Sequence, residues 1–471
     1  MAEQLTANRA RFDLQEILQV TNGRNTNFFE GFDVEGVVTD SRVFAAELDE
    51  TSHLFIALRG GKFDGHTFLT QVDGDAMAAL VETAQPELLL PQIEVPDTLK
   101  ALGDLARYHR KRFNIPVIGI TGSYGKTSTR ALLDAALSSK FKTLASQANF
   151  NNEIGVPMTL FQLDETYEAA IIEMGMRGRG QIEYLSRVAE PTIGVITNIG
   201  PQHIELLGSV EEIALAKAEL VEQLPENGLA VLPFDSAQFE LLRSNCKCRV
   251  MTFGTHEGAD YRVSQTQVSP EGWVEFSVGF GINKSQPVVL RLSGVHNAIN
   301  ASAAFAVAHQ LGVEPSEIAL ALENAELPGA RMRVVKTNGF TLIDDCYNAG
   351  PDSMRAALQT LLDFPGSGRR VAVLGDMKEL GEFSESEHQK IGAFAGQFIE
   401  LLIGIGGEMR PLLNSAIQAA RETENEMEVH WFETAQEARE EVGRMVEKND
   451  VVLVKGSRSV GLEAVVEELQ R

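Results

Sequence analysis

Cysteine is scarce in this chain: Cys246, Cys248 and Cys346 are the three cysteines among 471 residues. Three cysteines cannot form a four-cysteine zinc site or a disulfide framework. So low a count suits a reducing cytosol, and we take the Cys-x-Cys pair at 246 and 248 as incidental. The cysteine content therefore argues against a disulfide-stapled secreted protein.

Long apolar runs and excess positive charge are also missing. No segment approaches the roughly 20 apolar residues that a membrane span needs. Residues 1–19 are interrupted by charges and have no apolar core, so we expect no signal peptide. The formal net charge of −25 argues against a nucleic-acid partner. We expect a cytoplasmic protein with no stable membrane insertion.

The chain is long enough for about three domains, and its strand and helix pattern changes twice. Residues 1–113 form a small α/β module with strand-like segments at 34–39 and 52–57. Over 114–328 a regular strand–helix alternation predicts a parallel sheet covered on both faces, with a β-rich section at 261–292 and a helix at 296–311. Near residue 329 the pattern restarts as a Rossmann-like α/β domain over 329–471. The expected strands of the two larger domains are 117–121, 169–173, 193–198, 229–232, 340–345, 370–375, 401–404 and 451–455.

A glycine turn follows the apolar segment 117–120 and leads into Lys126 and Thr127. Glycines let successive backbone N–H groups turn toward one anion, and the following helix adds its positive N-terminal end. Lys126 would place a charge near the β- and γ-phosphates of a nucleotide, and the Thr127 hydroxyl would bind Mg²⁺. The loop is shorter than a full Walker motif, because Ile120 stands where that motif has glycine. A plain glycine turn with a surface lysine is the alternative.

Two polar residues lie at or beyond the ends of expected strands. Glu173 ends the strand 169–173, and His203 follows 193–198. Ligands gather at the carboxyl ends of parallel strands. A carboxylate at the tip of an apolar strand needs a positive partner, and Mg²⁺ is a natural one beside a triphosphate. Glu173 could instead cap a helix or pair with Arg177 or Arg179, and His203 alone could be an ordinary hydrogen-bonded histidine.

Lys217 falls on the apolar face of an expected helix. Ser209 and Glu212 form a capping box that starts this helix, and Lys217 lies seven residues after Val210 on its apolar stripe. An inward lysine is costly unless its ammonium is paired, reaches solvent or has a lowered pKa. Snorkelling or ion pairing is one interpretation. The other is a neutral amine that is chemically modified into a metal-facing group.

Two further clusters are suited to a nucleotide. Asn297, near the start of an Ala-rich helix, offers an amide donor and acceptor that could contact an adenine edge, although it could equally cap that helix. Asp345 follows the strand 340–345 and is placed to accept from ribose hydroxyls. An ordinary turn would use the same residues around Asp345.

These segments together resemble the Mur ligases, the ATP-dependent amide-forming ligases of peptidoglycan precursor synthesis, over almost the whole chain and in the same order. The segments that carry the resemblance are Ile-Thr-Gly-Ser-Tyr-Gly-Lys-Thr (120–127), Asn-Phe-Asn-Asn-Glu-Ile-Gly-Val-Pro (149–157), Glu-Met-Gly (173–175), Thr-Asn-Ile-Gly-Pro-Gln-His-Ile-Glu-Leu-Leu-Gly-Ser (197–209), His-Asn-Ala-Ile-Asn-Ala (296–301), Asp-Cys-Tyr-Asn-Ala (345–349), Leu-Gly-Asp-Met-Lys-Glu-Leu-Gly (374–381) and Val-Lys-Gly-Ser-Arg (454–458). In the N-terminal module, 40–42 and 54–66 resemble the family's UDP-end domain.

The resemblance implies a role for each matching residue. It implies catalysis by Lys126, Glu173, His203 and Lys217. One Mg²⁺ would lie on Thr127 and Glu173, and a second on His203 and a Lys217 that is carbamylated by CO₂. The phosphates of ATP would lie on Gly122, Ser123, Tyr124, Gly125, Lys126, Thr127 and Ser128.

The remaining matches concern the rest of the two nucleotides. Asn297 matches the family's adenine-contacting position, Arg331 its phosphate-contacting arginine and Asp345 its ribose-contacting acid, and Asn348 would lie against the nucleotide as well. The residues that match the UDP end are Ser41, Arg42, Asp64 and His66.

The resemblance is strongest to members that add D-alanyl-D-alanine to UDP-MurNAc-tripeptide, a step of cell wall biogenesis on which cell shape and division depend. It implies attack of the tripeptide carboxylate on the γ-phosphate, and then attack of the dipeptide amine on the acyl phosphate. The family default is a monomer. Departures from the family pattern at Cys346, Gly350 and Val460 bear on the substrate side.

Other functions stay open at this point. A ligase that adds the third peptide residue, or a folylpolyglutamate synthase, would share the scaffold, although the latter generally lacks the UDP-end domain. A P-loop NTPase that signals by conformational change would use full Walker motifs, which this chain lacks. A catalytically dead homologue is disfavoured by the presence of Lys126, Glu173, His203 and Lys217.

Overall fold

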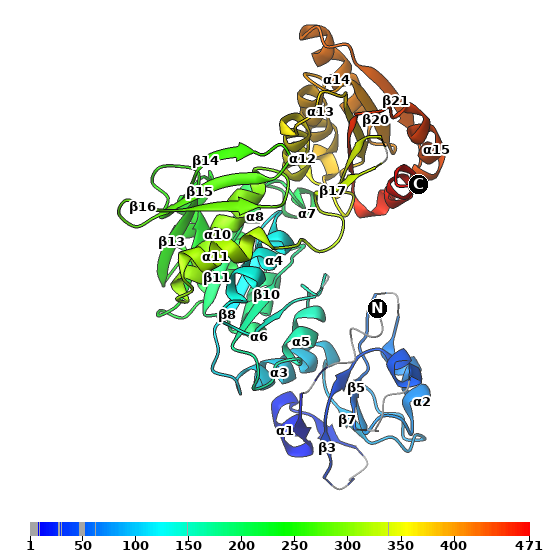
Figure 1. Ribbon diagram of the computed structural model, residues 1–471. Coiled ribbons are helices and arrows are strands. Elements are labelled where there is room, and N and C mark those ends of the chain that lie inside the picture. Colours follow the sequence, from blue (N-terminus) through cyan, green and yellow to red (C-terminus); the bar gives the residue numbers. More distant parts are fainter. Residues whose placement is uncertain are drawn as a thin grey trace.

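The computed structural model describes residues 8, 10–26, 29, 31–46, 52–61, 63–147, 149–337 and 339–471. Residues 1–7 and 9 of the N-terminal segment, and Lys62 of the 54–66 motif, lie outside these ranges. The described strands form three main sheets, and the central part of the chain lies between the N-terminal part and the C-terminal part (Figure 1). The three-part α/β architecture expected from the sequence is confirmed.

The N-terminal sheet is small. Its order is β2-β7-β6-β5-β4, and all neighbours are parallel except β2 and β7. These strands are β2 (Arg24–Asn25), β4 (Val37–Val38), β5 (Leu54–Ile56), β6 (Ala78–Val81) and β7 (Gln92–Glu94), and the helices are α1 (Leu14–Thr21), α2 (Leu69–Val72) and α3 (Thr98–Arg110), with short 3-10 turns η1 (Ser41–Ala46) and η2 (Gly65–Phe68).

The single strand predicted at 34–39 is wrong. The chain instead forms β3 (Asp33–Val34), which pairs antiparallel with β1 (Phe12–Asp13), and then β4 in the five-stranded sheet. The change of sheet occurs at Gly36, where a Cβ would lie 2.6 Å from the His53 ring. The apolar residues before and after this point belong to two different sheets. In the sequence they follow one another closely, which is why they resemble one longer strand.

The central sheet has the order β16-β15-β14-β13-β12-β11-β8-β10-β9. It is parallel from β9 to β14 and ends in the antiparallel strands β15 and β16. Its strands are β8 (Val117–Thr121), β9 (Thr143–Ala145), β10 (Ala169–Glu173), β11 (Ile193–Ile196), β12 (Leu229–Pro233), β13 (Arg249–Gly254), β14 (Tyr261–Val268), β15 (Val274–Phe280) and β16 (Lys284–Leu290). The helices of this part are α4 (Lys126–Leu137), α5 (Gly155–Leu160), α6 (Gln181–Ala189), α7 (Ile204–Leu207), α8 (Val210–Glu222), α9 (Phe239–Ser244), α10 (His296–Gln310) and α11 (Pro315–Glu323).

Both faces of the central sheet are covered, as expected for a parallel sheet. Along β8, Val117 joins the core that includes α6, whereas Ile118 and Ile120 join the core that includes α4 and α10. Burial on both faces explains why β8 and β10 are continuous apolar segments that end in a polar residue. The carboxyl ends of these strands are thereby the polar edge of an otherwise apolar layer.

The C-terminal sheet has the order β17-β18-β22-β19-β20-β21 and is parallel except for the pair β17 and β18. Its strands are β17 (Arg333–Lys336), β18 (Thr341–Asp344), β19 (Arg370–Gly375), β20 (Leu401–Ile405), β21 (Glu428–Phe432) and β22 (Val451–Lys455). Its helices are α12 (Pro351–Asp363), α13 (Ser384–Ala395), α14 (Arg410–Glu422), α15 (Ala435–Met445) and α16 (Glu463–Leu469), with turns η3 (Gly381–Phe383) and η4 (Arg458–Val460).

Most expected strands of the two larger sheets are confirmed. The predictions 117–121, 169–173, 370–375 and 451–455 have the same bounds as β8, β10, β19 and β22. The expected strand 193–198 ends earlier, at Ile196, because the next two side chains turn toward the glycine loop. Within the described part of the chain, no helix is both long and apolar enough to cross a bilayer.

The close crossing of α13 and α14 depends on a glycine. A Cβ on Gly392 would overlap the Leu412 carbonyl oxygen. We expect Gly392→Ala to lower the free energy of unfolding of the C-terminal part by about 1–3 kcal/mol, because the helices must separate. Urea unfolding followed by circular dichroism measures this change.

Gly443→Ala is the matched control, because Gly443 is exposed on α15 and the nearest contact of an added Cβ is ordinary, at 3.7 Å. Removing backbone freedom there should stabilise the protein by about 0.5–1 kcal/mol. A Gly392→Ala protein as stable as the Gly443→Ala protein would show that the crossing tolerates a methyl group.

Candidate active site

A cavity of about 740 Å³ lies at the carboxyl ends of the central strands, between the central and C-terminal parts. It brings together most residues predicted for ATP and metal. Those that line it are Ser123, Tyr124, Gly125, Lys126, Thr127, Ser128, Glu173, His203, Asn297, Arg331, Asp345 and Asn348. Gly122 and Lys217 are not among the lining residues, and the four residues predicted for the UDP end belong to the N-terminal part.

The glycine loop connects β8 to α4, and two glycines shape it. Gly122 and Gly125 have φ angles of 152° and 77°, which favour glycine. A Cβ on Gly122 would overlap the Thr197 hydroxyl, and one on Gly125 would lie 2.7 Å from Asn300 Oδ1. The loop therefore packs directly against β11 and α10, which hold it in shape.

Lys126 is half-buried inside the cavity and not on the open surface. Its Nζ donates to the carbonyl of Gly122 at 2.8 Å, so the ammonium bends back over the loop. Burial lowers the pKa of Lys126, with Glu173 opposing the shift and Arg331 adding to it. The structure thus excludes the alternative of a lysine on the outer surface of a glycine turn.

Asn198 supports the same loop, and sequence reasoning gave it no role. Its Oδ1 accepts from the Tyr124 N–H at 2.9 Å, and its Nδ2 donates to the Tyr124 carbonyl at 2.8 Å. The Ser123 hydroxyl donates to the Gly200 carbonyl at 3.0 Å. The signal was present, since Asn198 stands in a quoted motif just after a strand that neighbours β8.

Glu173 is buried, with 3% of its surface exposed, at the end of β10. The Thr127 hydroxyl donates to its Oε2 at 3.0 Å, and Asn151 Nδ2 donates to its Oε1 at 2.9 Å. Arg130 Nε lies 3.8 Å from Oε2. Arg130 follows Thr127 by three residues on α4, a helical spacing that could have revealed it.

The alternative pairing of Glu173 with Arg177 or Arg179 is wrong. Arg177 lies 3.6 Å from Glu379, and Arg179 lies 3.1 Å from Glu219. Both arginines extend from the loop after β10 toward other elements. The partners of Glu173 are therefore the Thr127 hydroxyl and the Asn151 amide.

The oxygens of Thr127 and Glu173 fit Mg²⁺, which prefers hard oxygen ligands. The described residues contain no group of three or more His, Cys, Asp or Glu that could hold a metal by themselves. A Mg²⁺ here would therefore take its other ligands from phosphate oxygens and water, as Mg²⁺ at phosphate sites usually does. The donor set is consistent with a metal that arrives with a nucleotide.

Lys217 is 2% exposed on α8, which Ser209 caps by accepting from the Glu212 N–H at 3.1 Å. Its ammonium makes no hydrogen bond or ion pair with the described residues. Burial lowers the pKa of Lys217 well below its usual value, and the charge of Lys126 adds to the shift. Neither snorkelling nor ion pairing accounts for this lysine, and a neutral amine is the form that its surroundings favour.

His203 precedes α7 and lies beside a residue of the C-terminal part. Its Nδ1 is 2.5 Å from Glu379 Oε2. Burial lowers the pKa of His203, and the charge of Glu379 opposes that shift. The backbone of His203 is left-handed, with φ 62°, which is uncommon outside glycine. The contact with Glu379 joins the central and C-terminal parts.

The residues predicted to contact the nucleotide come from both the central and the C-terminal parts. Asn297 does not cap α10, because the N-cap is Val295 and the Asn297 amide donates to the Ser293 carbonyl at 2.8 Å. Asp345 Oδ2 lies 2.6 Å from Lys455 Nζ. Lys455 had no predicted role although its segment was quoted, because only the parallel pairing of β18 and β22 brings it to Asp345.

Arg331 and Asn348 complete this side of the cavity. The Arg331 guanidinium lies 3.9 Å from the centre of the Tyr347 ring, and its Nη1 donates to the Pro328 carbonyl at 2.6 Å. The Asn348 carbonyl accepts from Lys455 at 2.9 Å. A planar cation stacked on an aromatic ring is held in a fixed orientation beside the cavity.

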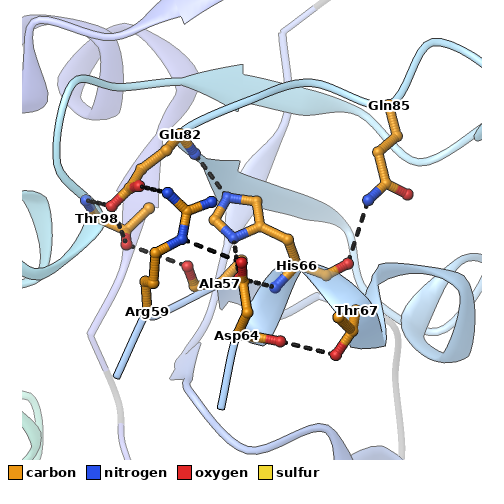
Figure 2. A network of polar contacts seen from close by, with 8 residues as sticks. All are labelled: Ala57, Arg59, Asp64, His66, Thr67, Glu82, Gln85 and Thr98. Carbon is orange, nitrogen blue, oxygen red and sulfur yellow. Dashed lines mark hydrogen bonds and ion pairs between the residues drawn. The ribbon is translucent and has the colours of Figure 1, made fainter. Parts of the chain in front are cut away.

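The predicted UDP-end residues lie at the ends of the N-terminal strands. Figure 2 shows His66 between Asp64 and Glu82: Nδ1 is 2.6 Å from Asp64 Oδ1, and Nε2 accepts from the Glu82 N–H at 2.8 Å. Arg59 bridges the two carboxylates, at 3.0 Å from Asp64 and 2.8 Å from Glu82. Both ring nitrogens of His66 are therefore engaged inside this network.

The other two UDP-end residues are more open. Arg42 pairs with Asp40, and the Ser41 hydroxyl donates to Gln71 Oε1 at 3.4 Å. The Arg42 side chain is 85% exposed, so the pair is on the surface and free to rearrange.

Comparison with known proteins decides among the ligase, NTPase and inactive-homologue hypotheses. The profile of the Mur ligase middle domain matches residues 120–308, and that of the Mur ligase, glutamate ligase domain matches residues 330–458. The UDP-N-acetylmuramoyl-tripeptide–D-alanyl-D-alanine ligase of Bacillus subtilis is 35% identical over 97% of this chain and 98% of its own length. The enzyme of that name from Synechocystis sp. is 38% identical over 97% of each chain.

The chain belongs to the Mur ligase family. The resemblance stated from its motifs is confirmed, and the chain is accordingly an ATP-dependent ligase. Among solved structures, MurF from Acinetobacter baumannii has a TM-score of 0.89 at 31% identity, covering 98% of this chain and 99% of its own. The MurF ligase of Thermotoga maritima in complex with ADP has a TM-score of 0.81 at 27% identity, covering 92% of this chain and 96% of its own.

The His66 network of this Mur ligase makes the stability of the N-terminal part depend on pH. Hydrogen bonds from the backbone and the ring of His66 lower the pKa of Asp64 to about 2. A carboxyl with a lowered folded-state pKa stabilises the fold above its unfolded pKa, about 4, and this contribution is lost as pH falls toward 2. We expect Asp64→Asn to be less stable than the native chain by a constant margin above about pH 5, and that margin should shrink between about pH 4 and about pH 2.

Urea titrations of both proteins across this pH range measure the margin. Asp73→Asn provides the control, because Asp73 belongs to the same part of the chain and is not one of the residues of the His66 network in Figure 2. A margin that stays constant down to the lowest pH would mean that the Asp64 carboxylate does not stabilise the fold through its charge.

Proposed function

We propose that the cavity joins D-alanyl-D-alanine to the terminal carboxylate of UDP-N-acetylmuramoyl-tripeptide with consumption of ATP. A carboxylate oxygen of the tripeptide bonds to the γ-phosphorus as the bond to ADP breaks. The dipeptide amine then bonds to the acyl carbon, inorganic phosphate leaves, and the amine loses a proton. The observation that carries the proposal is the cluster of Thr127, Glu173 and unpaired Lys217 around the glycine loop.

Charge neutralisation is the main requirement of the first step, since a carboxylate must approach a polyanion. Lys126 and the loop N–H groups would hold the phosphates, and the position of Lys126 inside the cavity supports this role. Thr127 and Glu173 would hold one Mg²⁺, and His203 with Lys217 a second. Bound Mg²⁺ would neutralise the phosphate oxygens and allow the carboxylate to reach the phosphorus.

Lys217 would bind its cation as a carbamate. Its neutral amine nitrogen bonds to the carbon of CO₂ and releases one proton, which converts the neutral amine into a negatively charged carbamate. The lowered pKa of Lys217 and its lack of a partner in the described chain support this modification. The negative carbamate would also be attracted to the charge of Lys126, which disfavours a positive charge on Lys217.

The adenosine of ATP would lie across the two larger parts. Asn297 would contact the adenine, Asp345 the ribose, and Arg331 and Asn348 the remainder of the nucleotide. Their common position on the cavity wall supports these roles. Ser41 and Arg42 would contact the UDP end, with Asp64 and His66 shaping that site through the network of Figure 2.

The domains that we propose are 1–113 for the UDP end, 114–328 for ATP and 329–471 for the C-terminal ligase domain. We also propose that the protein acts in the cytoplasm as a monomer on these small-molecule substrates. Closure of the domains around the substrates would exclude water from the acyl phosphate.

Phosphate release tests the ligase function. With ATP and Mg²⁺, the purified chain should release phosphate only when both UDP-MurNAc-tripeptide and D-alanyl-D-alanine are present. A coupled phosphate assay with each substrate omitted in turn measures this dependence. Lys126→Ala should abolish release, whereas Lys140→Ala should not, because Lys140 follows the far end of α4 and donates to the carbonyls of Leu311 and Gly312 outside the cavity. Equal release without either substrate would contradict the ligase function.

Lys217→Ala tests the carbamate. We expect ligation to fall by on the order of 100-fold, the loss typical of disturbed metal sites. Added short-chain carboxylates should restore part of the rate to Lys217→Ala but none to Lys217→Arg, because arginine fills the space that the carboxylate needs. An unaffected Lys217→Ala enzyme would show that the carbamate is not needed.

A further inference from the structure

The segment Leu374–Gly381 was singled out in the sequence, yet the proposed mechanism does not use it. It begins in the last two residues of β19 in the C-terminal part and continues into the loop after that strand. The N–H of Met377 donates to His388 Nε2 at 3.1 Å, and the N–H of Lys378 donates to the Ser457 hydroxyl at 3.0 Å. The loop is therefore held in a defined shape by its own domain.

This loop presents Glu379 to the central part. Oε2 of Glu379 lies 2.5 Å from His203 Nδ1, and Oε1 lies 3.6 Å from Arg177. Glu379 and His203 both have left-handed backbones, with φ 63° and 62°. Such conformations are unfavourable for residues other than glycine, and two of them meet at one contact, which is typical of functional sites. Next to them, Gly381 closely approaches Glu205, since a Cβ there would lie 2.7 Å from its Cγ.

A carboxylate beside one nitrogen of an imidazole sets the chemistry of the other nitrogen. When Nδ1–H donates to a carboxylate, Nε2 carries the lone pair, and the ring orientation is fixed. His203 lines the cavity, and its Nε2 makes no hydrogen bond within the described chain. The Glu379 carboxylate approaches Nδ1 as a charge contact and not as a hydrogen bond of ordinary geometry, and it favours the tautomer with the proton on Nδ1, which leaves Nε2 to bind a cation.

We propose that Glu379 is a positioning residue for His203, so that the cation site containing His203 is complete only while the C-terminal domain is docked. This inference rests on the proposed function for the role of His203. The contact between Glu379 and His203 can break and form again, because the Glu379 side chain is 42% exposed and water competes for it. Docking of the domain would then switch the cation site between two states.

Binding of Mn²⁺ to the full chain in the presence of ADP tests the proposal, with free Mn²⁺ followed by electron paramagnetic resonance. Glu379→Ala should weaken one class of Mn²⁺ sites by about 10–100-fold. Glu379→Gln, which keeps an oxygen acceptor for Nδ1–H, should recover part of the affinity. Glu382→Ala is the matched control, because Glu382 is an exposed acid on the same loop with no partner in the described chain.

A double-variant cycle separates positioning from a general structural effect. If Glu379 acts through His203, the pair His203→Ala and Glu379→Ala should bind Mn²⁺ as weakly as His203→Ala alone. Losses that multiply in the double variant, or an unchanged affinity in Glu379→Ala, would overturn the proposal. Unaltered circular dichroism spectra establish that each variant is folded.

The outcome is distinguishable from a failure of the ligase function. Should the native chain show no substrate-dependent phosphate release, the proposed function fails while the Mn²⁺ titrations still decide the role of Glu379. Should release be normal and Glu379→Ala bind Mn²⁺ like the native chain, the positioning role alone fails.

Discussion

Buried positive charge that the protein does not balance is the constraint around which the cavity is built. The charge of Lys126 lowers the pKa of Lys217, and the charge of Arg331 lowers the pKa of Lys126, in both cases in addition to burial. Glu173 is the carboxylate that opposes the shift at Lys126, and it is already shared with Arg130 and Thr127. A chain with a formal charge of −25 thus holds a locally positive cavity, which favours a polyanion over other ligands.

The backbone of the glycine loop is held rigidly, so these charged groups stay close together. Gly122 and Gly125 have no side chain, so Thr197 and Asn300 reach the loop and fix it from two sides. Asn198 then satisfies both the N–H and the carbonyl of Tyr124. Because these contacts come from the segment that directly follows β11 and from α10, the loop cannot open without disturbing the central sheet. The N–H groups of the loop that these contacts leave free are held in place before an anion arrives, so that binding it needs little reorganisation.

How well the sequence predicts this arrangement depends on how far apart along the chain the interacting residues are. β8, β10 and Lys217 are predictable because local apolar patterns reflect burial on a sheet or a helix. Local patterns do not reveal pairing across the fold, so Lys455 and Glu379 were given no role. The segment 34–39 fails for the same reason, since the exchange of partner strands at Gly36 leaves no trace in the alternation. The bounds proposed for the domains, and the roles of the site residues, depend on such distant contacts.

The division of the cavity between two domains links ligand binding to docking. The C-terminal part supplies Asp345 with Lys455 and the Glu379 contact, and Asp352 on α12 packs so closely on Gly200 that a Cβ there would overlap it. A ligand that touches both parts binds the docked state more tightly, and must therefore shift the equilibrium toward it. Among the described residues, none before Ser123 lines the cavity. Under the proposed function, the substrate must then bridge the distance from the N-terminal part with its own peptide, and its length selects which carboxylate reaches the phosphate.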